Sequence, residues 1–174
     1  MAFDLQQAVT HLTNIFPQPW SGYVNIYIAK PQQKLPDGKL TPWGVEKVIP
    51  LSQPGDLEIT NQVALNSFVA QGYNFYFSCG LMDNSTKREK KNVVGFHFLW
   101  ADVDDIDEKK ARELVDGCPL PPTGLIRTGG GYHFYWMLNR FHVMEEVREI
   151  ETSNKKVQGW VSGDAVGDAA RIFR

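Results

Sequence analysis

The residues best suited to chemistry end one apolar segment. The stretch FLWADVDDID begins with strand-forming residues and finishes with four aspartates, directly ahead of Glu108. Because side chains two apart in a strand point the same way, Asp102 and Asp104 are expected to project together. Two such carboxylates repel each other unless a cation lies between them, and carboxylate oxygens are natural ligands of Mg²⁺ and Mn²⁺. The pair therefore predicts a divalent-metal site.

These aspartates have two other interpretations. In one, they form a solvated turn in which Asp105 and Asp107 stabilise the start of a helix, with Asp105 and Glu108 in an acidic capping box. In the other, they begin a calcium loop with Glu113 at its last position. The calcium loop is excluded, because Asp107 occupies the position at which that loop requires glycine.

A second stretch, IRTGGGYHFYW, combines glycines with a histidine. Gly129, Gly130 and Gly131 allow main-chain N–H groups to approach an anion closely, and Thr128 adds a hydroxyl. His133, in the strand that follows, could donate a hydrogen bond to a phosphate oxygen. The alternative is a flexible hairpin followed by a core strand in which His133 is a satisfied polar residue. The stretch is neither a Walker A loop nor a dinucleotide-binding fingerprint.

A third stretch, SGDAVGDAARIFR, brings acidic and basic residues together near the end of the chain. Asp164 or Asp168 could add a third carboxylate to the metal site. Arg171 and Arg174 carry guanidinium groups, whose forked donors match phosphate oxygens. The alternative is a turn followed by a short salt-bridged strand.

The segments that must position these residues mix helices and strands. Helical spacing is typical of residues 3–16, with Asp4 as the cap, and of 56–72, 104–117 and 143–160. Strand patterns cover residues 22–30, 73–80, 92–104, 123–128 and 131–138. Because helices and strands do not alternate as regular βαβ units, we predict an α+β fold with helices mainly on one face of a sheet.

Composition and charge set further limits. The chain has 174 residues, 43% apolar and 22% charged, as expected for one globular domain. A net charge of −2 argues against attraction of nucleic acid to the whole surface, but it leaves room for a local basic groove. The cluster KREKKN is either a solvated loop or a nucleic-acid contact. Its basic members are Lys87, Arg88, Lys90 and Lys91.

Cysteine usage and hydropathy indicate a cytoplasmic protein. Cys79 and Cys118 are too few for a disulfide framework or a metal knuckle, and they are expected to be reduced thiols. The N-terminus lacks the features of a signal peptide, and no apolar run is long enough to span a bilayer. No membrane partner is therefore expected.

The three stretches, in this order, resemble the primase–polymerase (prim-pol) domains of the archaeo-eukaryotic primase superfamily, which occur in plasmids, phages and other mobile elements. The first motif of that family is a hydrophobic strand ending in DxD, here FLWADVD. The second is a small hydroxyl residue and glycines before a histidine, here TGGGYH. The third is an acidic residue ahead of two arginines, here GDAVGDAARIFR. The resemblance covers the chain from about Tyr73 onward.

The resemblance implies a single prim-pol catalytic domain over residues 1–174, built in two parts. An N-terminal αβαβ unit would occupy residues 1–90. An RRM-like, mainly antiparallel sheet with flanking helices would occupy residues 91–174. The family pattern continues beyond the position of Arg174, so the resemblance also implies a domain truncated at its C-terminus.

The resemblance also assigns roles to residues. Asp102, Asp104 and Asp164 would hold a pair of Mg²⁺ or Mn²⁺ ions. Asp168 is a rival third ligand, because the spacing from Asp164 to Arg174 is slightly shorter than the family pattern. The nucleotide triphosphate would be bound by the following residues: His133, Thr128, Gly129, Gly130, Arg171 and Arg174.

The implied activity is that of a DNA primase and DNA polymerase, a nucleotidyltransferase acting on nucleoside triphosphates and a single-stranded DNA template. Lys87, Arg88, Lys90 and Lys91 are candidate template contacts, and a fused or associated replicative helicase is a family-level expectation. Two alternatives remain. One is a non-catalytic RRM-like module that binds single-stranded nucleic acid through GGGYHFYW. The other is an inactive prim-pol relic.

A replication-initiator endonuclease fits poorly. Such an enzyme needs two histidines spaced His-x-His on one strand, whereas His97 and His133 are far apart in the sequence. Binding of free nucleoside triphosphate that depends on a divalent metal would separate the enzyme from the stacking module.

Overall fold

The computed structural model describes residues 4–59, 62–83, 86–128, 130–163 and 172–173. The strands are β1 Val24–Ala29, β2 Val45–Leu51, β3 Asn74–Ser78, β4 Leu81–Met82, β5 Val93–Asp104, β6 Gly124–Arg127, β7 Gly131–Val143 and β8 Ile172–Phe173. The α-helices are α1 Leu5–Ile15, α2 Asp56–Ile59, α3 Gln62–Ala70, α4 Glu108–Gly117 and α5 Val147–Trp160. None of these helices is both long and apolar enough to cross a membrane.

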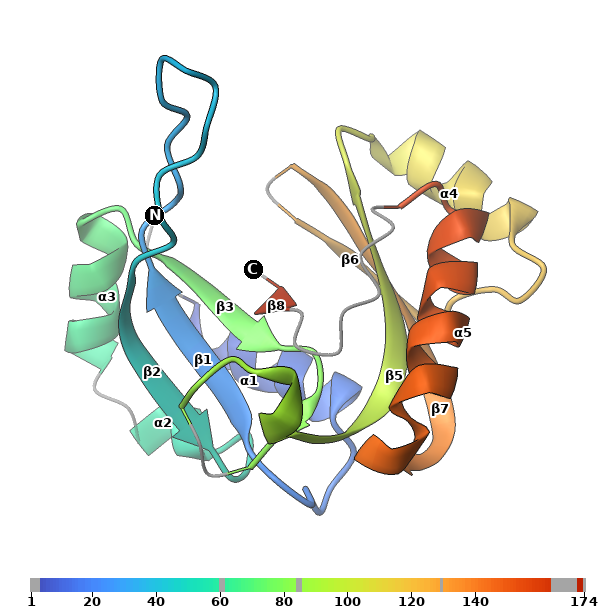
Figure 1. The fold of residues 1–174 in the computed structure, drawn as a ribbon, viewed down its shortest axis with the longest axis horizontal. Helices are drawn as coiled ribbons and strands as arrows, with labels where there is room; N and C mark the ends of the chain where they lie inside the picture. The colour runs from blue at the N-terminus through green and yellow to red at the C-terminus, as the bar shows by residue number, and fades with distance from the viewer. Residues whose placement is uncertain (1–3, 60–61, 84–85, 129, 164–171, 174) are drawn as a thin grey trace.

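The described strands form two antiparallel sheets, which confirms the α+β class (Figure 1). One sheet has the order β2-β1-β3-β8 and the other the order β4-β5-β7-β6. Figure 1 shows α2 and α3 beside the first sheet, and α4 and α5 on the side of the second sheet that faces away from the first. The predicted strands at 22–30, 73–80, 92–104, 123–128 and 131–138 are all present.

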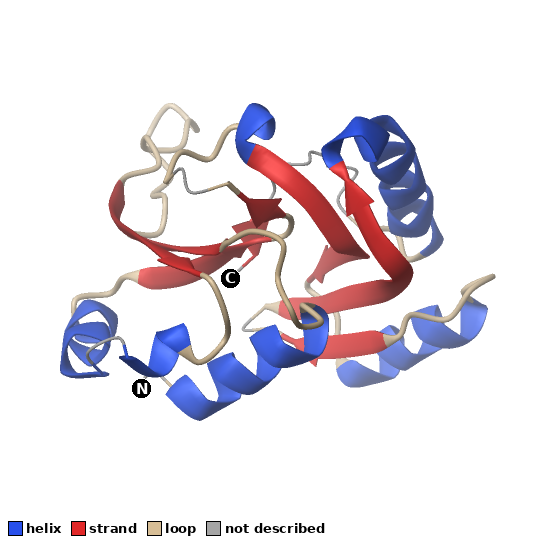
Figure 2. Cartoon of the chain, turned by 90° about the horizontal axis from the view of Figure 1, so that it is seen from below, coloured by secondary structure: helices blue, strands red, loops and turns tan. Residues whose placement is uncertain are grey.

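Helix α1 joins the two sheets. The Asp4 side chain accepts a hydrogen bond from the Gln7 N–H at 2.9 Å, which confirms Asp4 as the cap. The buried ring of Phe16, just after the helix, lies with its centroid 5.1 Å from that of Phe98 on β5 and 6.4 Å from that of Phe77 on β3. Figure 2 shows α1 running beneath both sheets, so its apolar face belongs to a shared core.

Helix α5 packs on β5 through a buried stripe at helical spacing, formed by Ile150, Asn154 and Val157. Asn154 is fully buried, and its Oδ1 accepts the main-chain N–H of Trp100 at 2.7 Å. At that residue β5 has β7 on one side, while the β4 pairing ends earlier, at Gly95. Asn154 therefore satisfies a donor on the open edge of the strand that carries the aspartates.

The N-terminal half differs from the prediction at two places. Strand β2 was not predicted, because its charged residues and Pro50 resemble a loop; β2 lies at the edge of its sheet, where proline is tolerated. The helix predicted over 56–72 is described as α2 and α3, on either side of residues 60–61. Helix α3 ends at Ala70, and Gly72 follows with a φ of +80°.

The helix after the aspartates begins later than predicted. The Asp107 side chain accepts the Lys110 N–H at 2.8 Å, so Asp107 caps α4 and the predicted capping box at Asp105 is wrong. Asp105 has a φ of +57° and donates its N–H to the Gly130 carbonyl at 2.8 Å. The last helix was also predicted to include Val143, which instead ends β7.

Two short strands cross the expected division near residue 90. Strand β4 precedes residue 90 but pairs with β5, and β8 follows it but pairs with β3. Two-residue strands leave no periodic signal. Strand β4 was not predicted, whereas β8 falls in the stretch for which a short strand was one of the two interpretations. The division into units 1–90 and 91–174 stays a prediction.

Candidate carboxylate and histidine site

The pairing of β5 with β7 brings the first two motifs together. Asp102 lies opposite His133, and Asp104 lies opposite Gly131. Residues directly opposite each other in an antiparallel pair share a face of the sheet, so the carboxylates and the imidazole lie on the same side. The distance from His133 Nε2 to Asp102 Oδ1 is 3.4 Å. Residues 31 positions apart in the chain thus form one local site.

The solvent exposure of the side chains increases across the site, from a buried interior to an exposed edge. His133 is 4% exposed, and its Nδ1 lies 3.2 Å from the Tyr135 hydroxyl. The Asp102 side chain is 20% exposed, and Asp104 is exposed. Tyr135, His133 and Asp102 therefore form a row that leads outward toward Asp104, which is where a ligand could approach from solvent.

Tyr135 is suited to fix the orientation of the imidazole. Complete burial raises the pKa of Tyr135 well above its usual value, with smaller contributions from Cys79 and Asp102, so its hydroxyl keeps its proton. When that hydroxyl donates to Nδ1 of His133, the ring proton lies on Nε2. Nε2 then donates toward the carboxylate side of the site.

The glycine hairpin is held tightly against β5. A Cβ atom at Gly131 would lie 2.0 Å from the Val103 carbonyl oxygen and 2.8 Å from the Asp104 Cα, so only glycine allows this approach. The Asp105 N–H donates to the Gly130 carbonyl across the same gap. The close approach sets the register that aligns His133 with Asp102.

Thr128 makes contacts within this hairpin. Its hydroxyl accepts the N–H of Gly131 at 2.9 Å and that of Gly130 at 3.4 Å. Its own N–H donates to the Gly131 carbonyl at 2.9 Å. The amide of Gly131, which was predicted to face an anion, therefore already has a partner, while the longer contact of Gly130 is weaker. Gly129 lies outside the described residues.

The four charged residues of the third motif lie outside the described part of the chain: Asp164, Asp168, Arg171 and Arg174. Within the described ranges, no three His, Cys, Asp or Glu side chains are grouped so that they could hold a metal ion. Gly163, the first residue of the motif, is described: a Cβ there would lie 3.0 Å from the Asp102 carbonyl oxygen.

The residues of the predicted basic cluster make different kinds of contact. The Arg88 guanidinium lies 4.9 Å from the centroid of the Trp43 ring. Lys90 forms an ion pair with Glu151 at 2.7 Å, and Lys91 forms one with Glu89 at 2.7 Å. The main-chain carbonyl of Lys87 accepts a hydrogen bond from the Asn92 side chain at 3.0 Å.

Two residues that shape the site were not predicted to be site residues. Tyr135 follows His133 by two positions, so strand periodicity places both on one face. Asn154 occupies an apolar-stripe position between Ile150 and Val157, and a polar residue there signals a buried hydrogen bond. Both signals are visible in the sequence, but neither identifies the partner.

Comparison with known proteins supports the fold assignment. No protein-family profile and no curated protein sequence matches the chain. Among solved structures, the AEP domain (PP-N190) of the cyanophage S-2L primase-polymerase is similar, with a TM-score of 0.70 and 19% identity over 100% of this chain and 82% of that one. Primase RepB' is similar with a TM-score of 0.57 and 14% identity, over 98% of this chain and 49% of that one. The chain therefore has the archaeo-eukaryotic primase-polymerase fold.

Proposed function

We propose that this chain is the nucleotidyltransferase domain of a primase-polymerase, which adds nucleotides to a strand paired with a single-stranded DNA template. The observation that carries the proposal is the row formed by Tyr135, His133 and Asp102, with Asp104 at its exposed end. The likeness to a phage primase-polymerase domain and to primase RepB' supports this choice of reaction.

The carboxylates fit a divalent cation. Asp102 and Asp104 offer oxygen donors on one face of β5, and Mg²⁺ and Mn²⁺ prefer such ligands. Asp164 would add the third carboxylate, with Asp168 as its rival. The contact of Gly163 with the main chain at Asp102 supports an origin for that ligand in the segment that follows. When bound, a two-metal pair activates the attacking 3′-hydroxyl and stabilises the leaving pyrophosphate.

His133 would bind the triphosphate. With Nδ1 beside the Tyr135 hydroxyl, Nε2 faces the carboxylate side of the site, 3.4 Å from Asp102 Oδ1, where it could donate to a phosphate oxygen bound next to that carboxylate. Burial of the ring in a preformed position means that little reorganisation is needed when charge develops on the phosphates. Thr128, Gly129 and Gly130 would lie beside the same phosphates, with Arg171 or Arg174 supplying positive charge.

Primer extension tests this function. The assay uses a primed DNA template, with deoxynucleotides or ribonucleotides and either Mg²⁺ or Mn²⁺, and it follows incorporation by gel. The Asp104→Asn variant is expected to lose activity by at least about a hundredfold, since removing a metal ligand exceeds the effect of removing its supporting partners. Asp116→Asn makes the same chemical change at an exposed site on α4, and it should retain full activity.

Two results would contradict the proposal. Incorporation by Asp104→Asn at the wild-type rate would show that this carboxylate is not part of the catalytic site. Absence of incorporation by the wild-type chain under every metal and nucleotide condition, with DNA binding intact, would instead favour the non-catalytic binding module.

A further inference from the structure

A second site of distinct chemistry lies on the N-terminal sheet. Trp43, in the loop between β1 and β2, is half-buried, and its ring centroid lies 5.9 Å from that of Tyr27 and 5.9 Å from that of Tyr76. Tyr27 and Tyr76 are paired across β1 and β3. The exposed Arg88 places its guanidinium 4.9 Å from the indole centroid. A loop tryptophan is thus anchored by two tyrosines and covered by a cation.

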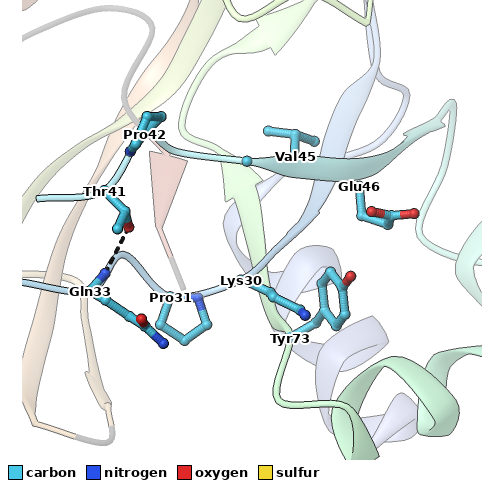
Figure 3. A pocket seen from close by; sticks show the side chains of 9 residues that line it. Lys30, Pro31, Gln33, Thr41, Pro42, Val45, Glu46 and Tyr73 are labelled. Atoms are coloured by element: carbon cyan, nitrogen blue, oxygen red, sulfur yellow. Dashed lines mark hydrogen bonds between the residues drawn. The ribbon is translucent and has the colours of Figure 1, made fainter.

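A hollow of about 370 Å³ lies beside the loop that carries this tryptophan (Figure 3). Pro42 and Gly44, the chain neighbours of Trp43, both line it. Lys30 and Tyr73 also line it, with Lys30 Nζ 5.1 Å from the Tyr73 ring centroid. Trp43 and Arg88 are not among its lining residues, so we call Trp43 and Arg88, with Tyr27 and Tyr76 beside the indole, the Trp43 surface.

The rim of the hollow also carries polar groups in fixed positions. The Thr41 hydroxyl accepts the Gln33 N–H at 2.9 Å, and the Gln32 side chain donates to the Thr41 carbonyl at 2.7 Å. A bridge between Lys34 and Leu40 closes the same loop. These contacts hold the loop that presents Trp43, so the ring does not need to be ordered when a ligand binds.

Alternating rings and cations are the composition of surfaces that bind single-stranded nucleic acid. Bases stack on aromatic side chains, and phosphates between successive bases are neutralised by lysine and arginine. We propose that the Trp43 surface binds a segment of single-stranded DNA, with a base stacked on Trp43 and a phosphate at Arg88. The choice of DNA rests on the proposed function.

The contacts of the basic cluster support Arg88 as the relevant cation. Lys90 and Lys91 are each held by a carboxylate, whereas Arg88 lies over an aromatic ring. A guanidinium over an indole can stay beside a base that stacks on the same ring, because its charge is spread over a plane. Of these three cations, Arg88 is therefore the one whose contacts fit a phosphate beside a stacked base.

Fluorescence anisotropy of a labelled oligothymidylate of about 16 nucleotides, recorded with the full chain in EDTA and without nucleotide, tests this surface. Trp43→Ala should weaken binding by roughly tenfold to a hundredfold, whereas Trp43→Phe, which keeps a ring, should weaken it less. Arg88→Gln should lower the slope of log affinity against log salt by about 0.7. Lys155→Gln, which also removes one positive charge, at an exposed site on α5, should match wild type.

Duplex DNA should bind more weakly than the single strand, since paired bases cannot stack on an indole. Equal binding of duplex and single strand would overturn the proposal.

A second measurement does not depend on how well the variants fold. DNA that carries 5-iodouracil is photocrosslinked to the wild-type chain, and the modified peptide is identified by mass spectrometry. The proposal predicts crosslinks in the peptide that contains Trp43. Crosslinks confined to other peptides, or wild-type affinity in a folded Trp43→Ala variant, would overturn it.

These tests can fail independently of the proposed function. If the chain binds DNA at Trp43 but never incorporates nucleotides, the polymerase proposal falls and the Trp43 surface stands. If the chain extends primers and Trp43→Ala binds template normally, the Trp43 surface falls and the polymerase proposal stands.

Discussion

Asp102 and His133 face each other across one pair of strands, whereas Trp43 and Arg88 meet where two loops approach each other. The first pair is largely buried and held by main-chain pairing on β5 and β7. The second is half-buried at Trp43, exposed at Arg88 and held by ring contacts. The two proposals together imply a division of roles. Chemistry that needs fixed atoms would be placed on strands, and contact with a flexible polymer would be placed on loops.

Removal of the His133 side chain should have the largest effect that separates the two regions. We expect His133→Ala to raise the KM for nucleotide by roughly tenfold to a hundredfold, because a hydrogen bond to a charged phosphate is lost. The value of kcat should change less, and the affinity for single-stranded DNA should stay at the wild-type level. Steady-state kinetics and anisotropy on the same preparation measure both. Equal loss of DNA affinity would show that the two regions are not separate.

Two glycines in the same sheet sharpen the claim that the carboxylate site is rigid. Gly131→Ala places a Cβ against the Val103 carbonyl and should lower the free energy of unfolding by about 1 to 3 kcal/mol. Gly124→Ala, whose nearest atom would be the Tyr135 Cβ at 3.8 Å, should change it by less than about 1 kcal/mol. Denaturant unfolding compares the two. Equal stabilities would mean that the hairpin is not tightly held.

The ring of His11 packs between the two sheets. Its centroid lies 5.3 Å from that of Phe77 on β3 and 5.7 Å from that of Tyr135 on β7. Burial lowers the pKa of His11 from 6.5 to about 4. Between these values the unfolded chain binds a proton that the folded chain does not, so stability should fall as pH drops from 6.5 to 4. The loss is about 3 kcal/mol.

The His11→Phe variant keeps the ring packing and removes the proton site. Its unfolding free energy should therefore depend less on pH in that window than that of the wild type. Carboxylates with a lowered pKa, such as Asp56 beside Ser52, also destabilise the fold in acid, and the comparison of the two proteins cancels their effect. An identical pH slope in both proteins would contradict the assignment to His11.

The smallest expected effect separates two neighbours in the basic cluster. Arg88→Gln should weaken DNA binding several-fold more than Lys90→Gln, because Lys90 is already paired with Glu151. Exposed ion pairs contribute little, so Lys90→Gln should also change stability by no more than about 1 kcal/mol. Fluorescence anisotropy of labelled DNA, at the same salt concentration for both variants, measures the two affinities. Equal losses of DNA affinity would indicate a diffuse basic patch instead of the Trp43 surface.

The carboxylate site could be predicted from sequence because its signals are local. Asp102 and Asp104 share a face by strand periodicity, and the glycines before His133 mark a hairpin. The motif resemblance then placed these stretches in one fold, which the structural comparison confirms. Strand β2, by contrast, was missed because Pro50 and its charged residues carry no strand pattern.

The Trp43 surface had no such signal. Tyr27, Trp43, Tyr76 and Arg88 are separated by many residues, and Trp43 and Arg88 lie in loops, so only the paired strands of the sheet bring them together. Asp105 is a second example of a contact that the sequence pattern did not reveal. Its spacing to Glu108 suggested a helix cap, but the contact of its N–H with Gly130 comes from a distant hairpin.

The proposal that Asp102 and Asp104 hold a divalent metal ion is tested most directly by the binding of Mn²⁺. The electron paramagnetic resonance signal of the free ion measures that binding. We predict that the wild-type chain, in the presence of a nucleoside triphosphate, removes Mn²⁺ from solution. A chain that carries both Asp102→Asn and Asp104→Asn should bind far less Mn²⁺, and Asp116→Asn should bind as much as the wild type. Equal Mn²⁺ binding by the wild type and the double variant, both folded, would contradict it.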